Sequence, residues 1–445
     1  MSRSTIKKPL IGFLPMLNNF GETYPLVEVA KNCKKLGMDL IFFESYNPQY
    51  TNLVKDLGCK IIKIRDPPPE EYVKDIARLE ESLGSDNLSF EKACSELVDE
   101  KYEEVIINDI KKELEVFKKT KIDILVSSGF EFTAHISTSL LDIPLVTLIS
   151  GAVSQTYFKS NLGSFPDNYE NLLTKLIPKS IKNRFTNWYI PKDKSNIKSY
   201  NKISKNFSAP IKKSFLELFY GDYTLVVDDK EFVGVKNLDD SNYERWVGPI
   251  LPPKLDNVYN DKLEKDIGKH IEKPGKSILL SMGSSTTKNL FIKILKKLDT
   301  TSYNVIAIYT SILNEEECSK LKLHDNIILT KFAPSIKNIN EKVDLAIIHG
   351  GRGTVYTAAY SGKPVIGIPM HFEQQCNLNN LTRHGDGFVL SKKYFTGKKL
   401  VTKINKIFNN YDEFLKNSKN LKNKLPEPKG AKNAAKIISN IINHK

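Results

Sequence analysis

The sequence lacks any run of about 18 apolar residues, which is the length that a helix needs to cross a lipid bilayer. It also lacks a signal peptide, because the apolar stretch near its start is short and quickly interrupted, and residues 9–17 instead predict a first β-strand. We therefore predict a cytoplasmic protein.

Cysteine is scarce, and neither cysteines nor acidic residues are spaced as metal ligands. The five cysteines are odd in number and scattered, which predicts reduced thiols that mostly serve packing. The pairs Asp228-Asp229 and Asp239-Asp240 are typical of solvated loops, and no Asp-x-Asp sequence precedes a suitable strand. We therefore predict no metal ion and no cofactor. The cysteines are Cys33, Cys59, Cys94, Cys318 and Cys376.

Length and composition indicate two folded domains. The 445 residues are about three times a typical single-domain length, and a hydrophobic content of 40% excludes wholesale disorder. Strand and helix patterns alternate, as expected of α/β domains with doubly wound sheets. A Gly- and Pro-rich stretch at 247–253 predicts an interdomain linker. Further expected strands are 40–43, 122–126 and 145–148, and expected helices are 25–36, 103–118 and 430–443.

The segment 349–390 carries the most informative pattern. An apolar strand at 345–348 ends in His349-Gly350-Gly351-Arg352-Gly353-Thr354, and a helix is expected over 355–360. Glycines allow backbone N–H groups to come close to an anion, and a helix N-terminus adds unpaired donors and a positive dipole end. This turn therefore predicts a diphosphate-binding site.

A polar pair follows the next strand. Gly362-Lys363-Pro364 ends the helix, residues 365–369 predict a short strand, and Glu373-Gln374 comes after it. Carboxylate and amide oxygens suit the hydroxyl groups of a sugar. Together with the glycine turn, this pair predicts a nucleotide-sugar site.

The ordered motifs resemble the donor-binding signature of the UDP-glycosyltransferase-like family. They are His-Gly-Gly-x-Gly-Thr, then Gly-x-Pro, then Pro-x-x-x-Glu-Gln-x-x-Asn, which ends in Pro369, Glu373, Gln374 and Asn377. The resemblance implies the GT-B fold, in which two Rossmann-like domains face each other across a cleft, and sugar transfer with inversion. It implies an acceptor-binding domain at 1–247, a linker at 248–256 and a donor-binding domain at 257–445, whose terminal helix crosses back to the first domain.

The same resemblance implies residue roles in donor binding. Phe332 and Pro334 stand where the family has an aromatic that stacks on the base, and Glu373 and Gln374 are expected to bind the sugar. Thr357 stands where many members have a ribose-binding Glu, and because it offers only one contact, the choice among UDP, dTDP and GDP sugars stays open, with UDP expected. The expected phosphate-binding residues are His349, Gly350, Gly351, Gly353, Thr354, Gly283, Ser284 and Ser285.

The catalytic positions depart from the family pattern. Members carry Gly-His-x-x-Pro in the first loop, and here Gly21-Glu22-Thr23-Tyr24-Pro25 places Glu22 at the His position. The partner Asp is replaced by Ser128. A carboxylate can still accept a proton from a hydroxyl, so Glu22 is the expected general base; the alternative is that its charge only stabilises the following helix. Glu131 and His135 are the next candidates, and packing is favoured for His135.

A strongly basic insertion is expected at about 165–215. Between residues 171 and 213 there are eleven Lys and Arg residues against one acid, Asp193, which concentrates most of the +14 net charge there. No nucleic-acid-binding motif accompanies the charge, so nucleic acid is not an expected partner. The basic residues are Lys175, Lys179, Lys182, Arg184, Lys192, Lys194, Lys198, Lys202, Lys205, Lys212 and Lys213.

An apolar stripe lies beside this charge, and the combination suits a lipid headgroup layer that contains anionic lipids. We favour contact with the inner face of the cell membrane over the alternative, a solvated cover over the acceptor cleft with its stripe packed inward. The stripe consists of Leu173, Leu176, Ile177, Ile181 and Phe185, followed by Trp188 and Tyr189.

Together these features predict an inverting, metal-independent hexosyltransferase that uses a nucleotide-sugar donor and a hydroxyl of a lipid or other amphiphilic acceptor. Three alternatives stay open: a catalytically silent nucleotide-sugar-binding protein, a glycosyltransferase acting on a soluble small molecule, and a basic polyanion-binding protein that retains the fold.

Overall fold

The computed structural model describes residues 8–16, 19–44, 50–67, 69–71, 102–194, 197–236, 244–252, 261–283, 285–333 and 335–443. Five residues for which the sequence made predictions lie outside these ranges, as does part of the expected linker: Cys94, Asp239, Asp240, Ser284 and Pro334.

Seven parallel strands form the first sheet, in the order β3-β2-β1-β4-β5-β6-β7. The two central strands, β1 and β4, are almost entirely buried and apolar, as expected of a sheet that is covered on both faces. The strands are β1 (Leu10–Leu14), β2 (Asp39–Glu44), β3 (Lys60–Lys63), β4 (Ile124–Ser128), β5 (Leu145–Ile149), β6 (Tyr223–Val226) and β7 (Glu244–Trp246).

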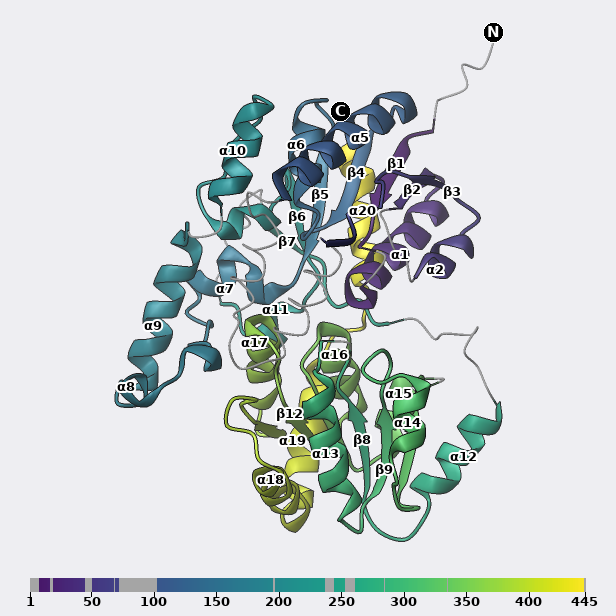
Figure 1. Ribbon diagram of the computed structural model, residues 1–445, viewed down its shortest axis with the longest axis vertical. Helices are drawn as coiled ribbons and strands as arrows, with labels where there is room; N and C mark the ends of the chain where they lie inside the picture. The colour runs from purple at the N-terminus through teal and green to yellow at the C-terminus, as the bar shows by residue number, and fades with distance from the viewer. Residues whose placement is uncertain are drawn as a thin grey trace.

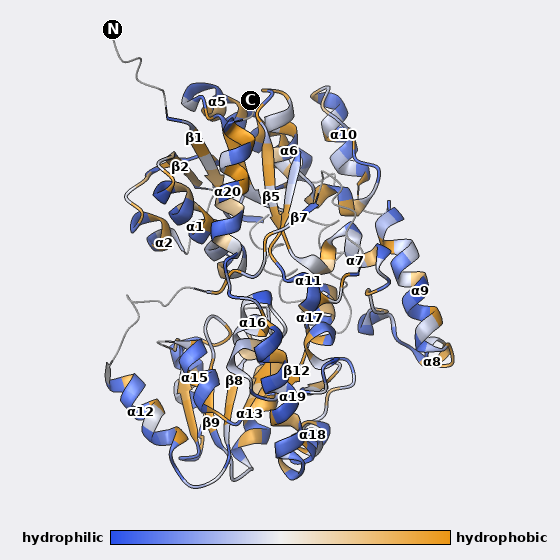
Figure 2. Cartoon of the chain, turned by 180° about the vertical axis from the view of Figure 1, so that it is seen from behind, coloured by the Kyte–Doolittle hydropathy of each residue, from blue (hydrophilic) through white to orange (hydrophobic). Residues whose placement is uncertain are grey.

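Six parallel strands form the second sheet, in the order β10-β9-β8-β11-β12-β13. The two sheets lie one above the other in Figure 1, and Figure 2 shows that strands of both sheets are largely apolar. The strands are β8 (Ser277–Ser281), β9 (Asn304–Ile308), β10 (Ile327–Thr330), β11 (Leu345–Ile348), β12 (Val365–Gly367) and β13 (Gly387–Val389).

Helices alternate with the strands in both halves, which confirms the predicted α/β fold with two doubly wound sheets. In the first half they are α1 (Phe20–Lys35), α2 (Thr51–Lys55), α5 (Glu103–Thr120), α6 (Phe132–Ser139), α7 (Gln155–Lys159), α8 (Leu172–Lys175), α9 (Lys179–Tyr189), α10 (Lys198–Asn206) and α11 (Lys230–Val233). In the second they are α12 (Asp261–Ile271), α13 (Lys288–Asp299), α14 (Glu315–Lys320), α15 (Ile336–Lys342), α16 (Arg352–Ser361), α17 (Phe372–Thr382), α18 (Gly397–Asn409), α19 (Tyr411–Lys424) and α20 (Gly430–Asn443).

The direction of winding reverses at one place in each sheet, between β1 and β4 and between β8 and β11. Ligands of doubly wound sheets bind beyond the carboxyl ends of the strands at these switch points. The carboxyl ends of these four strands and the segments that follow them carry Glu22, Ser128, Gly283 and the glycine turn at 349–353. The topology therefore gathers the predicted base and the predicted phosphate site from four separate stretches of sequence.

Helix α1 begins earlier than expected. The sequence suggested a start at Pro25, but the helix begins at Phe20, and the side chain of Asn19 caps it by accepting from the N–H of Gly21. Asn is a strong N-cap residue, and it outweighs the one backbone hydrogen bond that Pro25 cannot donate inside the helix. Glu22 therefore lies in the first turn of α1, not in a loop ahead of it.

The last helix returns to the first sheet, as the resemblance implied. Ala434, Ala435 and Ile438 of α20 are buried in the core that α1 and the first sheet share, and Asn433 donates to the carbonyl of Val247. Figure 1 shows α20, in yellow, beside α1 among the elements of the first half. Among the described residues, no helix is both long and apolar enough to cross a membrane.

Candidate active site

Gly283 and Gly351 pack closely against the ring of His349, which lies between the segments that follow β8 and β11. Gly283 has a φ of 63°, and a Cβ there would lie 2.4 Å from Cε1 of His349. A Cβ on Gly351 would lie 2.5 Å from Nε2 of the same ring. Gly350 has a φ of 96°, and its Cβ would lie 2.6 Å from the carbonyl oxygen of Gln374. The turn therefore needs glycine at these positions for its own packing, before any ligand is considered.

His349 is neutral at ordinary pH. Burial lowers its pKa to about 4, and Nδ1 faces the carbonyl oxygen of Ser281 at 3.5 Å. Because a carbonyl only accepts, Nδ1 carries the proton and Nε2, beside Gly351, is an acceptor. His349 is therefore uncharged in this arrangement, and donation to a diphosphate from Nε2 would require the other tautomer or protonation of the ring.

Helix α16 begins at Arg352, three residues before the expected start, with Gly351 as its N-cap and no side-chain cap. Gly353 and Thr354 thus lie in its first turn, where backbone N–H groups point away from the helix. The hydroxyl of Thr354 donates to the carbonyl of Gly351 at 2.8 Å. Thr357 is buried, and its hydroxyl donates to the carbonyl of Gly353, so its one polar group is used inside the helix; this argues against the expected ribose contact.

Gln374 joins two loops of the second sheet. Its Nε2 donates to Oγ of Ser285 at 2.9 Å, and its Oε1 accepts from the N–H of Met370 at 2.9 Å. The amide of Gln374 is therefore engaged in positioning the turn between β12 and α17. Glu373 lies in the first turn of α17, and its charge raises the pKa of Glu22 and that of Arg352.

Glu22 and Ser128, the two departures from the family pattern, meet directly. Oγ of Ser128, at the end of β4, donates to Oε2 of Glu22 at 2.9 Å. Burial raises the pKa of Glu22, Glu373 and Glu131 raise it further, and Arg352 and the Ser128 hydrogen bond oppose that shift. The pair thus provides a carboxylate that is 17% exposed and has a raised pKa, held by a hydroxyl from β4.

Arg352 is the site residue that the sequence reasoning missed. Its Nη2 lies 3.9 Å from Oε1 of Glu22, and its guanidinium is within hydrogen-bonding reach of the Tyr24 hydroxyl. Asp228, two residues after β6, and Glu373 also act on it electrostatically, and the carboxylates raise the pKa of Arg352 against the effect of burial. The prediction of a solvated loop was wrong for Asp228, which is buried and accepts from the N–H of Gly151. The signal in the sequence was a cation at the variable position of the glycine turn, combined with a carboxylate in place of the usual His.

The two further base candidates are engaged elsewhere. Glu131 is almost fully buried and its Oε2 lies 2.8 Å from Nη1 of Arg65, in a buried ion pair. Nδ1 of His135 lies 3.3 Å from Nζ of Lys212, and burial together with that ammonium holds the pKa of His135 well below its usual range. These contacts favour structural roles for both residues.

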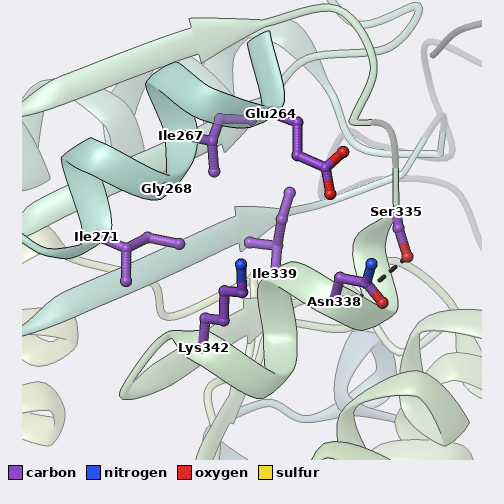
Figure 3. A pocket seen from close by; sticks show the side chains of 8 residues that line it. All are labelled: Glu264, Ile267, Gly268, Ile271, Ser335, Asn338, Ile339 and Lys342. Carbon is purple, nitrogen blue, oxygen red and sulfur yellow. Dashed lines mark hydrogen bonds between the residues drawn. The ribbon is translucent and has the colours of Figure 1, made fainter. Parts of the chain in front are cut away.

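Phe332 follows β10 with 37% of its surface exposed, which leaves its ring accessible for stacking. A separate cleft of about 300 Å³ lies between α12 and α15 (Figure 3), with Ile267, Ile271 and Ile339 between Glu264 and Lys342. None of the predicted site residues lines it.

A second cleft, of about 350 Å³, lies between the basic insertion and the turn that joins β12 to α17. Residues 166–169 form one side, and residues 369–372 with Gln375 and Lys392 form the other. The side-chain amide of Gln375 spans the two, because Oε1 accepts from Asp167 and Nε2 donates to Phe165, each at 2.9 Å.

The apolar stripe of the insertion is exposed, contrary to the inward-packed alternative. Helices α8 and α9 project at the edge of the molecule, away from both sheets (Figure 1). Lys182 is an exception among the basic residues, because it is buried and its Nζ lies 2.6 Å from Glu170. The exposed residues are Leu172, Leu173, Leu176, Ile177, Ile181, Phe185, Trp188 and Tyr189, with exposed fractions between 43% and 85%.

No group of three or more His, Cys, Asp and Glu side chains within the described ranges is arranged to hold a metal ion. The metal-free reaction stays a prediction.

Comparison with known proteins adds three findings. Residues 278–436 match the Glycosyltransferase family 28 C-terminal domain. The chain is 22% identical over 439 residues to an uncharacterized UDP-glucosyltransferase, YojK, of Bacillus subtilis (strain 168), covering 96% of each chain. It is 23% identical over 196 residues to the UDP-N-acetylglucosamine--N-acetylmuramyl-(pentapeptide) pyrophosphoryl-undecaprenol N-acetylglucosamine transferase of Bacillus pumilus (strain SAFR-032), covering 42% of this chain and 52% of the other.

Among solved structures, the calicheamicin glycosyltransferase CalG4 superposes with a TM-score of 0.66 at 14% sequence identity, and the match covers 98% of this chain and 99% of that one. This similarity confirms the GT-B fold.

Proposed function

We infer a specific reaction for this chain, which belongs to the UDP-glycosyltransferase-like family and is a glycosyltransferase of the GT-B fold that uses a nucleotide-sugar donor. The reaction moves a hexose from a UDP-sugar to a hydroxyl of an amphiphilic acceptor, with inversion and without a metal ion. The observation that carries the proposal is the hydrogen-bonded pair of Glu22 and Ser128. Glu22 of this pair faces Arg352, which is the first residue of α16.

In this reaction Glu22 takes the proton of the acceptor hydroxyl while the hydroxyl oxygen bonds to the anomeric carbon. The bond from that carbon to the diphosphate breaks, and its electron pair leaves with UDP. Backbone N–H groups at Gly351, Gly353 and Thr354, together with the α16 dipole, offset the charge that develops on the leaving group. Attack from the face opposite the leaving group accounts for inversion.

Glu373 is expected to read the sugar and not the nucleotide. Losing a hydrogen bond to a charged group costs ~1.5–3 kcal/mol, so Glu373→Ala should lower transfer by roughly ten- to a hundredfold. UDP affinity, measured by calorimetry, should stay near the wild-type value. Glu316→Ala, at an exposed ion pair with Lys320, is the matched control. Equal losses of UDP and UDP-sugar affinity in Glu373→Ala would place this carboxylate at the nucleotide.

The proposed acceptor is a lipid or other amphiphile reached at the inner face of the cell membrane. Ile181, Phe185, Trp188 and Tyr189 follow one another on one side of α9, and exposure of so many large apolar side chains is costly in water. The surrounding charge is positive and suits anionic headgroups. The relative from B. pumilus is named for a pyrophosphoryl-undecaprenol acceptor, which supports a lipid substrate here.

The membrane proposal is tested by vesicle flotation. Each Lys near an anionic surface contributes ~1 kcal/mol, so reversing the exposed Lys179, Arg184 and Lys194 to Glu should release the protein from acidic liposomes. The same charge change on α19, in Lys416, Lys419 and Lys424, should leave binding intact. Identical flotation of both triple variants would favour a soluble acceptor.

A catalytically silent nucleotide-sugar-binding protein is the second candidate, because Arg352 lies beside the carboxylate that would act as base. The two candidates separate in one assay. Release of UDP from UDP-sugar by the wild type, with lipid extract as acceptor, excludes the silent protein, whereas tight binding without turnover excludes the transferase.

A further inference from the structure

Arg352 lies where the glycine turn of the second sheet comes close to helix α1 of the first half. It is the first residue of α16, directly after the glycine turn, and its side chain is only 10% exposed. The groups around its guanidinium come from separate elements: Glu22 and Tyr24 from α1, Asp228 from the segment after β6, and Glu373 from α17. Three carboxylates therefore act electrostatically on this cation, and of these Glu22 has an oxygen within 4 Å of it, at 3.9 Å.

Two contacts limit the basicity that burial gives to Glu22. Its Oε2 accepts from Ser128, and its Oε1 faces the guanidinium of Arg352. Both contacts stabilise the charged form and lower the affinity of the carboxylate for a proton. A base that must take a proton from a hydroxyl works better when such partners are loosened.

We propose that Arg352 is a donor-sensing residue, which holds Glu22 in the unloaded enzyme and turns to the diphosphate when the nucleotide sugar binds. Release of Arg352 then frees Oε1 of Glu22 for the acceptor hydroxyl. This inference rests on the proposed roles of Glu22 and the glycine turn, and it adds an order of events: the base becomes active only when the donor is in place.

The diphosphate is a strong competitor for this guanidinium. It would lie at the N-terminus of α16, whose first residue is Arg352, and it carries more negative charge than a single carboxylate. Arginine binds phosphate through paired N–H donors of fixed geometry, which a carboxylate nearly 4 Å away does not engage. Asp228 and Glu373 remain near the vacated position.

The proposal predicts that Glu22 and the diphosphate compete for Arg352. The affinity for UDP, measured at one fixed pH and without sugar transfer, reports this competition. Glu22→Gln removes the competitor, so UDP affinity should rise by about three- to tenfold. Arg352→Gln removes the phosphate contact, so UDP affinity should fall by roughly tenfold or more. In the double variant, Glu22→Gln should bring no gain over Arg352→Gln alone, because the two residues act through each other. Arg352→Lys should recover part of the affinity, and Lys416→Gln on the exposed face of α19 is the control that removes one positive charge elsewhere.

The pH profile gives an independent readout. Arg352 lowers the pKa of Glu22, whereas burial, Glu373 and Glu131 raise it. A carboxylate base must be ionised, so activity rises with pH through its pKa. In the wild type the acid limb of kcat should therefore lie at higher pH than that of kcat/KM for the donor. The first reports the donor complex, in which Arg352 has left Glu22, and the second reports the enzyme without donor. In Arg352→Gln the two limbs should coincide.

Additive effects of the two substitutions on UDP affinity, or an unchanged affinity in Glu22→Gln, would overturn the sensing role and leave the proposed reaction intact. The binding measurements are repeated with dTDP and GDP, which share the diphosphate. If the wild type binds none of the three, the donor site itself is wrong, and the sensing role fails with it. Glu22→Gln retains the size of the side chain, so it tests the proposal even if Arg352→Gln does not fold.

Discussion

Replacing Glu22 with Gln should lower sugar transfer to the acceptor by about 10²–10⁴-fold, the usual contribution of a general base. The amide keeps the shape of the side chain and can still accept from Ser128, but it cannot take a proton from the acceptor hydroxyl. The measurement is the initial rate of UDP release with saturating donor and acceptor, together with a UDP affinity to show that the donor site is intact.

Glu28→Gln is the matched control for this variant. It lies on the same helix, α1, and forms a surface ion pair with Lys31, which contributes little to stability. Wild-type transfer in Glu22→Gln would mean that the base lies elsewhere. Glu131 would then be tested first, despite its ion pair with Arg65, and the silent-binding protein would gain support if no residue proved essential.

Replacing Gly351 with Val should abolish nucleotide binding. A Cβ at this position would lie 2.5 Å from Nε2 of His349, so the ring or the turn must shift, and the added methyl groups would fill the space where a diphosphate approaches the first turn of α16. The measurement is UDP binding by calorimetry, accompanied by thermal unfolding to show that the variant is folded.

Gly268→Val in α12 is the matched control, because a Cβ there meets no atom within 4 Å. It introduces the same residue into a helix outside the predicted site and should leave UDP affinity unchanged. A folded Gly351→Val protein that binds UDP normally would show that the nucleotide does not lie on this turn.

The strand, glycine turn and helix at 345–361 could be predicted from the sequence because their signals are local. A buried strand, a run of glycines and a helix start lie within ten residues, so the glycine turn forms from neighbouring parts of the chain. The bounds of β11 and α20 agree with the sequence pattern, because apolar periodicity alone defines them. Helix starts were less reliable: side-chain capping by Asn19 and the glycine turn before Arg352 decided them, against the position of Pro25.

The sequence by itself determined the fold class, the position of the glycine turn and the amphipathic insertion, since each depends on short-range periodicity or a contiguous motif. Only the tertiary structure decided which distant side chains meet: Ser128 reaches Glu22 across 106 residues, and Arg352 reaches it from the other sheet. A periodic pattern shows which residues share a face but not whether another element covers it. The same limit applies to the stripe of α8 and α9, which proved exposed, and to Thr357, which proved buried, because burial is a property of the assembled chain and not of any one segment.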